Sequence, residues 1–327
     1  MWFRTIFHRR DKADLIEDLR RELPPADLSF PPSAWRQLDR LRLRASRHIR
    51  GRGAGQRPSA RRRPAVDFRQ HRKYVPGDDV RFVDWKASAR HEHIFLKQGE
   101  QPQEVAVYLL IDTTTSMAWG RPPKRDTALR LAATLGYLAL ANDDRLHIVP
   151  LSEQVRTLPK HLGPLKGKGQ FPSLLNYLRD IPFDTPPSDS PTGITQPIRD
   201  FNRRVARGGV VIILSDLLDA HDLSKTLAVF PPPAWEVTVL HLLHPRELAP
   251  EINGEFEMID AETGRSVNYD ITPKALDEYR EHLQTWRDAV EMTCIEHKAF
   301  YTLISTGWSL EKEIVPHLRS VRVLELV

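Results

Sequence analysis

The sequence predicts an α/β fold, an open and mostly parallel sheet flanked by helices, preceded by a basic helical and linker extension. From Val105 onward, short apolar runs alternate with helical patterns, which is typical of such sheets. The net charge is +12 over residues 1–97 and −7 over residues 98–327, so the two parts of the chain differ electrostatically. We therefore expect three segments: an N-terminal helical segment (1–50), a basic linker with a distinctive motif block (51–104), and the α/β domain with a C-terminal helix and strand (105–327).

The N-terminal segment shows the spacing of short helices. Apolar residues recur at helical intervals from Leu15 to Leu23, before one pair of prolines, and from Trp35 to Leu43, after a second pair. Residues 40–73 then hold 13 basic side chains and one acidic side chain, Asp67, with glycines and a proline that interrupt any helix. This composition predicts a basic linker.

The α/β domain is read from runs of apolar residues. Strands buried on both faces are expected at Val105–Ile111, Leu146–Val149, Val210–Leu214, Val237–Leu243 and Phe300–Ile304. Helices are expected at Thr127–Ala141, Pro172–Arg179, Gln196–Val205, Leu223–Phe230 and Pro273–His297. Thr272 is a candidate cap for the last helix, which has proline in its first turn. Ligands of such sheets bind at the carboxyl ends of the strands.

A cluster of carboxylates and hydroxyls stands at those strand ends. Asp112 follows the first strand, and Thr114 and Ser116 come two and four residues later. Asp216 follows a second strand, which brings it to the same edge, and Thr192 precedes a helix. Hard divalent cations prefer such oxygen ligands. The sequence therefore predicts a Mg²⁺ or Mn²⁺ site.

These residues also have other interpretations. Asp and Thr at strand ends can cap the following helix without any ion, an alternative that stays open for the Asp112 loop taken alone. Two acids at two strand ends favour the metal. His91 and His93 lack a third ligand nearby and predict no zinc site. Cys294 has apolar helical neighbours and is expected in the core.

Enzyme classes fit the sequence less well. Phosphatases of the haloacid dehalogenase type carry a second acid two residues after the nucleophilic Asp, and Thr114 stands there. The phosphate-binding Gly-rich loop, His-Glu-x-x-His and Gly-x-Ser-x-Gly motifs do not occur. We therefore expect no catalytic activity.

The cluster resembles the metal-ion-dependent adhesion site of von Willebrand factor type A domains, written Asp-x-Ser-x-Ser with a distant Thr and a distant Asp. Asp112, Thr114 and Ser116 match the first motif, Thr192 the lone Thr, and Asp216 the last acid. Thr114 stands where Ser is usual and keeps the hydroxyl. The resemblance implies a Rossmann-like von Willebrand A fold whose ion leaves a coordination position for an acidic residue of a partner.

The block before the domain resembles the signature of the bacterial domain of unknown function 58 family. The residues that carry it are Arg72, Tyr74, Pro76, Gly77, Asp78, Asp79, Arg81, Asp84, Trp85 and Arg90. In that family the block precedes a von Willebrand A-like domain, and the genes stand beside those of MoxR-type AAA+ ATPases. The resemblance implies an adaptor that works with such an ATPase in the maturation or assembly of a protein substrate.

The block also has a physical interpretation. Pro76-Gly77 predicts a tight turn, with the acids of the block facing its arginines in a charge-paired network. In this interpretation the block braces the first strand, and Trp85 is a packing anchor.

An alternative function rests on the basic residues. Segment 40–73 could bind nucleic acid or an anionic surface through release of counterions, but it has few aromatic residues for stacking, so nucleic acid is the less favoured partner. A weaker alternative is membrane-surface contact by Trp2, Phe3, Ile6 and Phe7. A single cysteine and the lack of an apolar run near the ~20 residues that span a bilayer predict a cytoplasmic protein without a transmembrane segment.

Overall fold

The computed structural model describes residues 5–8, 26–45, 68–76, 80, 83–90, 93–99, 104–151, 161–183, 194–205, 208–218, 222–250, 254–260 and 266–327. The chain forms two compact units. One joins residues 1–49 to residues 105–327, and the other comprises residues 50–104. Each unit is described by itself.

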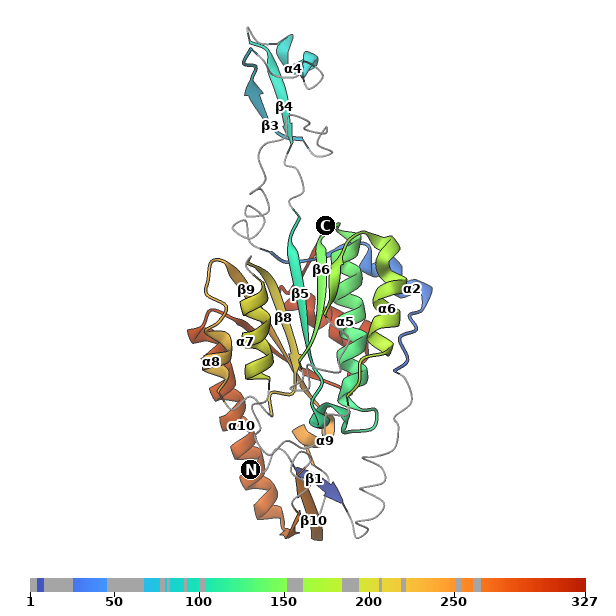
Figure 1. Cartoon of the computed structure of the whole chain (residues 1–327), viewed down its shortest axis with the longest axis vertical. Coiled ribbons are helices and arrows are strands. Elements are labelled where there is room, and N and C mark those ends of the chain that lie inside the picture. The colour runs from blue at the N-terminus through green and yellow to red at the C-terminus, as the bar shows by residue number, and fades with distance from the viewer. Residues whose placement is uncertain are drawn as a thin grey trace. The chain divides into compact units, whose positions relative to one another are not determined.

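The larger unit is built on a mixed sheet flanked by helices. In the described part of the chain this sheet has six strands in the order β12-β9-β8-β5-β6-β7, parallel except for β7 (Figure 1). The strands are β5 (Ala106–Asp112), β6 (Arg145–Leu151), β7 (Leu162–Leu165), β8 (Gly209–Ser215), β9 (Trp235–Leu243) and β12 (Phe300–Ser305). Every residue of β5 and β8 is buried, as their continuous apolar runs predict for central strands.

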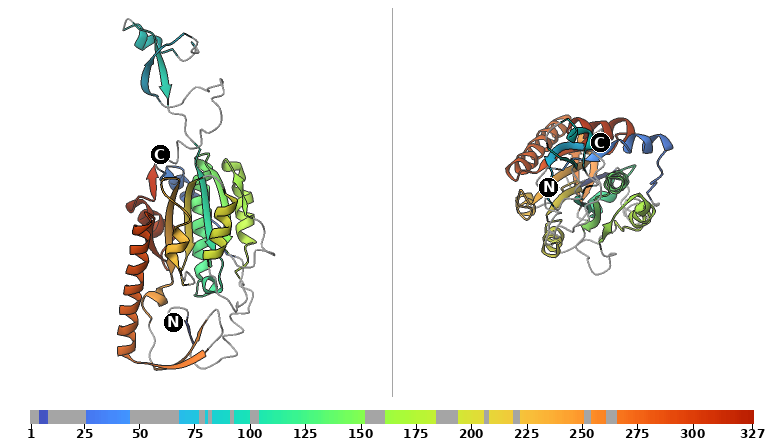
Figure 2. Two further views of the ribbon diagram at one scale, coloured as in Figure 1. Left: turned by 60° about the vertical axis from the view of Figure 1, so that its left-hand side comes forward. Right: turned by 90° about the horizontal axis from the view of Figure 1, so that it is seen from above.

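Helices cover both faces of this sheet. One face packs on α5 (Lys124–Ala141), α6 (Phe171–Arg179) and α11 (Val315–Ser320). The other packs on α7 (Thr195–Arg204), α8 (Leu223–Leu227) and α10 (Pro273–Glu296). Figure 1 shows α5 and α6 on one side of the strands and α7 and α8 on the other, and Figure 2 shows α10 alongside the sheet. Successive residues of β5 point to opposite faces of the sheet. Leu109 therefore lies in the core on one face and Leu110 in the core on the other.

Three residues show how the sequence determines α10 and the contact between α5 and α6. The Thr272 hydroxyl accepts a hydrogen bond from the Ala275 N–H at 3.3 Å, so the predicted cap of α10 is confirmed. Cys294 is fully buried, as expected, and this burial raises the pKa of its thiol to about 12. A Cβ on Gly136 of α5 would lie 2.6 Å from Leu174 Cδ2, so glycine allows the two helices to approach closely.

The N-terminal residues pack on this unit. Helix α2 (Pro32–Leu38) places the Trp35 ring 4.6 Å from that of Tyr137. The predicted helix from Trp35 to Leu43 is wrong in its second half. It ends at Leu38, and β2 (Leu41–Leu43) pairs antiparallel with β13 (Leu324–Leu326), so Leu41 and Leu43 are buried by strand alternation.

A separate small sheet comprises β1 (Thr5–His8), β10 (Gly254–Asp260) and β11 (Ser266–Ile271), all antiparallel. Ile6 and Phe7, two of the candidate membrane contacts, lie on β1 opposite Ile259 and Met258. The remaining short elements are α9 (Pro245–Leu248), turns of 3-10 helix at Thr115–Ala118 and Lys168–Gln170, and a π-helical turn at Leu310–Ile314. Within the residues that the structure describes, no helix is both long and apolar enough to cross a bilayer.

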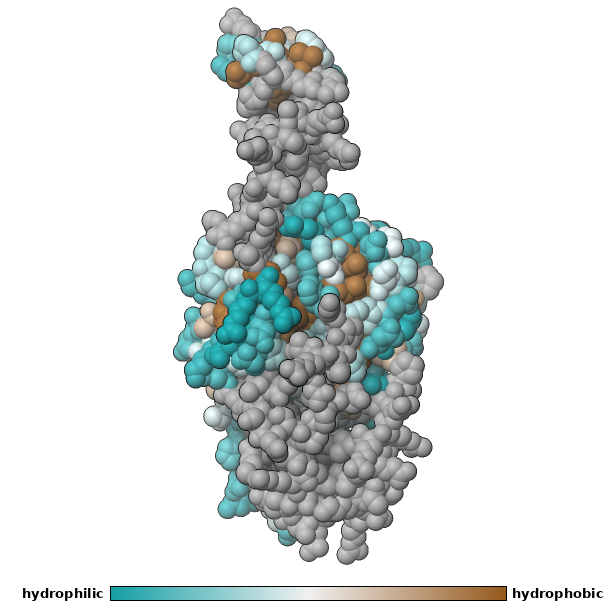
Figure 3. All heavy atoms as spheres, viewed as in Figure 1, coloured by the Kyte–Doolittle hydropathy of each residue, from teal (hydrophilic) through white to brown (hydrophobic). Residues whose placement is uncertain are grey.

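The smaller unit holds β3 (Phe68–Lys73), β4 (Phe95–Gly99) and α4 (Trp85–Ser88). Asp84 caps α4 by accepting the Lys86 and Ala87 N–H groups, each at 3.0 Å. The prediction that Trp85 anchors packing is wrong, because its exposed fraction is 69%. Val80 is also exposed, and hydrophobic surface of this unit shows brown in Figure 3.

Several residues of the predicted charge network lie outside what the structure describes. Gly77, Asp78, Asp79 and Arg81 are not among the described residues, and neither is the side chain of Arg72. Of the basic segment, residues 40–45 and 68–73 are described.

Candidate functional site

The ends of β5 and β8 bring two predicted acids to one edge of the sheet. Asp112 is the last residue of β5, and Asp216 directly follows β8. Both are fully buried. The parallel register aligns Ile111 with Leu214, and the Ser215 hydroxyl donates to Asp112 Oδ2. The carboxyl edge of the sheet therefore carries a buried acidic pair.

The loop after β5 folds its hydroxyls around Asp112. Oδ1 of Asp112 accepts the Thr114 N–H at 3.0 Å and the Thr114 hydroxyl at 2.7 Å. Thr114 Oγ1 and Ser116 Oγ lie 3.0 Å apart, and Ser116 belongs to a 3-10 turn. Three of the five predicted ligands thus converge, and a fourth, Asp216, follows the neighbouring strand. Thr192, the fifth, lies outside the described residues.

The spacing of these oxygens is that of the hydrogen bonds that join them, and it also matches the separation of neighbouring ligands around a small divalent cation. Mg²⁺ holds its ligands at about 2.1 Å in an octahedron, which places neighbouring ligand oxygens about 3 Å apart. The Asp112–Thr114 and Thr114–Ser116 oxygen distances are 2.7 and 3.0 Å. Within the described residues no three His, Cys, Asp or Glu side chains are placed to hold a metal. A cation at this edge would therefore depend on the hydroxyls.

A buried lysine meets the second acid. Lys124, the first residue of α5, is fully buried, and its Nζ donates to Asp216 Oδ2 at 2.7 Å and to Glu247 Oε1 at 2.6 Å. The ammonium also lies 5.8 Å from the centre of the Trp119 ring. The other oxygen of Glu247 accepts the His244 N–H at 2.6 Å and so closes the first turn of α9.

Sequence reasoning did not find Lys124 or Glu247. Lys124 stands in a polar Pro-Pro-Lys-Arg-Asp stretch that resembles a solvated helix start. Glu247 follows β9 by four residues, so the edge rule that found Asp216 also applies to it.

Asp216 is held on several sides. Its Oδ1 accepts the Leu218 N–H at 3.1 Å, and its carbonyl oxygen contacts His241 Nε2 at 3.0 Å. The other ring nitrogen of His241 contacts the Tyr301 hydroxyl at 2.8 Å. Burial lowers the pKa of His241 to about 3, so this ring is neutral at physiological pH.

Burial perturbs the ionisable groups of the cluster. Burial, with a smaller contribution from Asp216, raises the pKa of Asp112 to about 7, although hydrogen bonds from Ser215 and Thr114 oppose the rise. Burial by itself lowers the pKa of Lys124, but Asp216 and Glu247 together reverse this and raise it. Burial also raises the pKa of Glu247 against the opposing effect of Lys124. Lys124 pairs with Asp216 and Glu247, whereas the groups that donate to Asp112 are two hydroxyls and a backbone N–H, which carry no formal charge.

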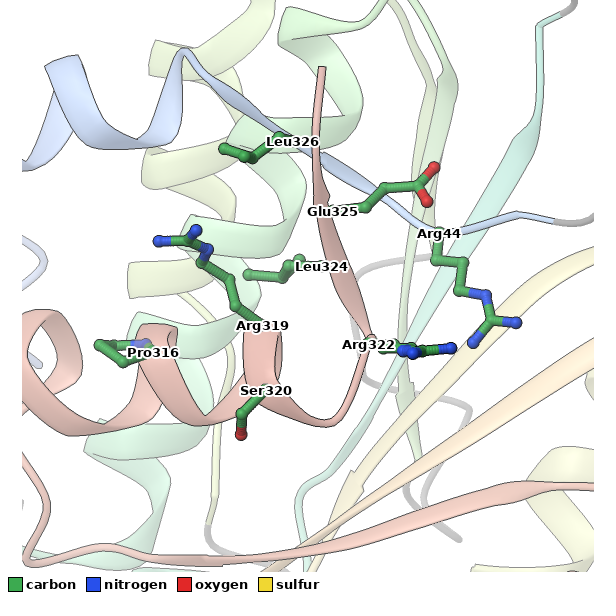
Figure 4. A pocket seen from close by; sticks show the side chains of 8 residues that line it. All are labelled: Arg44, Pro316, Arg319, Ser320, Arg322, Leu324, Glu325 and Leu326. Atoms are coloured by element: carbon green, nitrogen blue, oxygen red, sulfur yellow. The ribbon is translucent and has the colours of Figure 1, made fainter.

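A second feature lies at residues 316–326 with Arg44. A cavity of about 690 Å³ is lined by Arg44, Pro316, Arg319, Ser320, Arg322, Leu324, Glu325 and Leu326 (Figure 4). Arg44 and Arg322 extend to the same side of β13, and Arg319 lies across it. Next to this cavity, Arg42 pairs with Glu325 at 2.9 Å.

Comparison with known proteins shows where the chain belongs. It is similar to the crystal structure of conserved hypothetical protein BatB from Bacteroides thetaiotaomicron, with a TM-score of 0.37 and 14% identity over 66% of this chain and 98% of that one. It is 25% identical over 236 residues to the uncharacterized proteins Mb1516 of Mycobacterium bovis and Rv1480 of Mycobacterium tuberculosis, a match that covers 70% of this chain and 71% of each relative. The family described as "Protein of unknown function DUF58" matches residues 70–289, and the chain is therefore a member of the DUF58 family.

Proposed function

We propose that this protein is a non-enzymatic interaction module of the von Willebrand A type, with a metal-ion-dependent adhesion site at the edge of its sheet. Mg²⁺ or Mn²⁺ would be held by the cluster around Asp112, with Thr192 and Asp216 as further members. The convergence of the side-chain oxygens of Asp112, Thr114 and Ser116, each 2.7–3.0 Å from the next, carries this proposal. Asp216 lies at the same edge of the sheet. When bound, the ion would supply a coordination position for an Asp or Glu of a partner.

The environment of Asp112 supports ligation over catalysis. Both of its oxygens already accept hydrogen bonds, from Thr114 and from Ser215. A nucleophilic role would also need an acid to protonate the leaving group, and the position used for this in phosphatases is Thr114. Its hydroxyl does not donate a proton at neutral pH.

We assign the partners by family membership. The signature block and the match to the DUF58 family support a MoxR-type AAA+ ATPase as one partner and a protein substrate as the other, with maturation or assembly of that substrate as the output. The proposed location is the cytoplasm, where such an ATPase finds its ATP.

Affinity purification of the full chain tests this function. The protein is retrieved from its own cells in Mg²⁺ or in EDTA, and a MoxR-type ATPase is quantified by mass spectrometry. Thr114→Val removes the central hydroxyl and keeps the side-chain shape. Thr113→Val is the matched control, because the Thr113 hydroxyl donates to the Leu151 carbonyl at 2.9 Å and is not one of the predicted ligands.

We expect ATPase capture in Mg²⁺ with the unmodified chain and with Thr113→Val, and loss of capture with EDTA or Thr114→Val. Equal ATPase capture in all four samples, which are the unmodified chain in Mg²⁺ or in EDTA and the two variants in Mg²⁺, would contradict the proposal. Hydrolysis of any of a panel of phosphate esters in Mg²⁺, abolished by Asp112→Asn, would overturn the non-enzymatic assignment.

The alternative of nucleic-acid or anionic-surface binding by residues 40–73 has one structural observation in its favour, the arginine-lined cavity that includes Arg44. Neutralising Arg61, Arg62 and Arg63 should weaken binding to duplex DNA or anionic vesicles and reduce its salt dependence. Nanomolar, sequence-selective DNA binding at physiological salt would displace the adaptor function.

A further inference from the structure

The Lys124 ammonium is an unusual feature of this edge of the sheet. Its side chain is 1% exposed and the Asp216 side chain is 0% exposed. Burial of an ammonium is costly unless it is paired and hydrogen-bonded. Lys124 meets this condition through two carboxylates, at 2.7 Å from Asp216 and 2.6 Å from Glu247.

The hydrogen bonds divide the cluster into two halves. In one half, Asp112 Oδ1 accepts a hydrogen bond from the Thr114 hydroxyl, which also contacts the Ser116 hydroxyl. In the other, both oxygens of Asp216 have partners in the fold, Oδ2 with Lys124 and Oδ1 with the Leu218 N–H. Both acids are hydrogen-bonded through both oxygens, but Asp216 is paired with a buried ammonium, whereas the donors to Asp112 are uncharged hydroxyls and an N–H.

Neighbouring groups fix the place of the lysine. Glu247 is held by the His244 N–H, and the His244 ring packs edge-on against Trp119 at 5.2 Å. Trp119 in turn lies over the ammonium. A Cβ on Gly120 would stand 2.6 Å from the His244 ring, so the loop between Ser116 and Lys124 is packed tightly on α9.

We propose that Lys124 is a built-in counter-cation that reserves Asp216, so that a divalent ion at this edge is ligated by Asp112, Thr114 and Ser116 while Asp216 stays outside its direct ligands. This inference rests on the proposed function and states how the same site is regulated. Lys124 is a positioning residue in this scheme.

The arrangement has a functional consequence. An ion with one direct carboxylate ligand keeps a net positive charge, whereas two carboxylates would neutralise it. The first case lowers the affinity of the free protein for the ion and strengthens the attraction of the bound ion for an acidic partner group. Lys124 thereby weakens binding of the ion to the free protein and strengthens binding of an acidic partner to the ion-loaded protein.

Calorimetric titration with Mg²⁺, at constant pH and ionic strength, tests the inference on the full chain. Lys124→Met removes the ammonium and leaves a side chain of similar length. Because the single variant leaves Asp216 and Glu247 buried without a cation, a second variant combines Lys124→Met with Glu247→Gln. This double variant removes one positive and one negative charge, so the net charge of the cluster is unchanged. Lys168→Met is the control, because that lysine forms an exposed pair with Asp39.

We expect Mg²⁺ to bind the double variant at least tenfold more tightly than the unmodified chain, with the control unchanged. We also expect Mg²⁺ to raise the melting temperature of the Lys124→Met chain more than that of the unmodified chain, because the ion replaces the missing ammonium. Equal or weaker Mg²⁺ binding by the double variant would overturn the inference.

Failure of the inference and failure of the proposed function give different results. If the unmodified chain binds Mg²⁺ and the double variant gains nothing, the role of Lys124 is wrong and the ion site stands. If only the Lys124 variants bind, Lys124 does reserve Asp216, but the free protein holds no ion. If none of the chains binds Mg²⁺, both are wrong.

Discussion

Replacement of Asp112 by asparagine should change how stability depends on pH. Burial and Asp216 raise the pKa of Asp112 from 3.8 to about 7, so the folded state holds a proton on this carboxyl over a range in which the unfolded chain has released it. The resulting stabilisation is present in full below the unfolded value and is lost as the pH rises through the folded value. An asparagine at this position cannot ionise, so the variant should lack this loss.

The size of the effect follows from the shift. A rise from 3.8 to about 7 corresponds to roughly 4 kcal/mol at about 1.36 kcal/mol per unit of pKa. Asparagine can keep the local hydrogen bonds, since its oxygen can face Thr114 and its amide can donate to the Ser215 hydroxyl, which already accepts the Leu217 N–H at 2.8 Å. The substitution should therefore stabilise the protein at about pH 8 and have little effect at about pH 4.

Urea unfolding in EDTA at a series of pH values measures this directly. The free energy of unfolding of the unmodified chain should fall relative to the Asp112→Asn chain between about pH 4 and about pH 7 and run parallel to it above. Identical pH profiles for the two chains would show that Asp112 ionises normally. If the free energy of unfolding fell more steeply with pH in the Asp112→Asn chain than in the unmodified chain, the surroundings would lower the pKa of Asp112 and not raise it.

Three further substitutions test the fold. Gly136→Ala should destabilise by about 1–3 kcal/mol in urea unfolding, because its Cβ would press on Leu174 at 2.6 Å; an unchanged midpoint would refute this contact. Thr272→Ala should cost about 1 kcal/mol by removing the cap bond to the Ala275 N–H, and the same chain with Thr272→Ser should recover most of it. Lys168→Met should change stability by less than about 1 kcal/mol, since its ion pair is half exposed; a larger loss would mean that this pair is coupled to the core.

The central strands and one half of the site were accessible from sequence because their signals are local. Continuous apolar runs predict β5 and β8 to within a residue or two, and Asp112, Thr114 and Ser116 lie in one loop at fixed spacing. Asp216 needed one further rule, that neighbouring parallel strands end at the same edge.

The errors have a common physical cause, which is contact between distant parts of the chain. Leu41 and Leu43 fit a helix until they pair with β13 near the end of the sequence. Lys124 gave no signal in the sequence, because its partners Asp216 and Glu247 are brought to it by the ends of two strands far along the chain.

Binding of Mn²⁺ to the purified full chain, followed by the electron paramagnetic resonance signal of the free ion, tests the central claim most directly. We predict one ion bound per chain, at least tenfold weaker binding by Thr114→Val, and unchanged binding by Thr113→Val, whose hydroxyl is hydrogen-bonded to Leu151 in the unmodified chain. Binding that is absent from the unmodified chain, or that is indifferent to the Thr114 hydroxyl, would contradict a cation site at the end of β5.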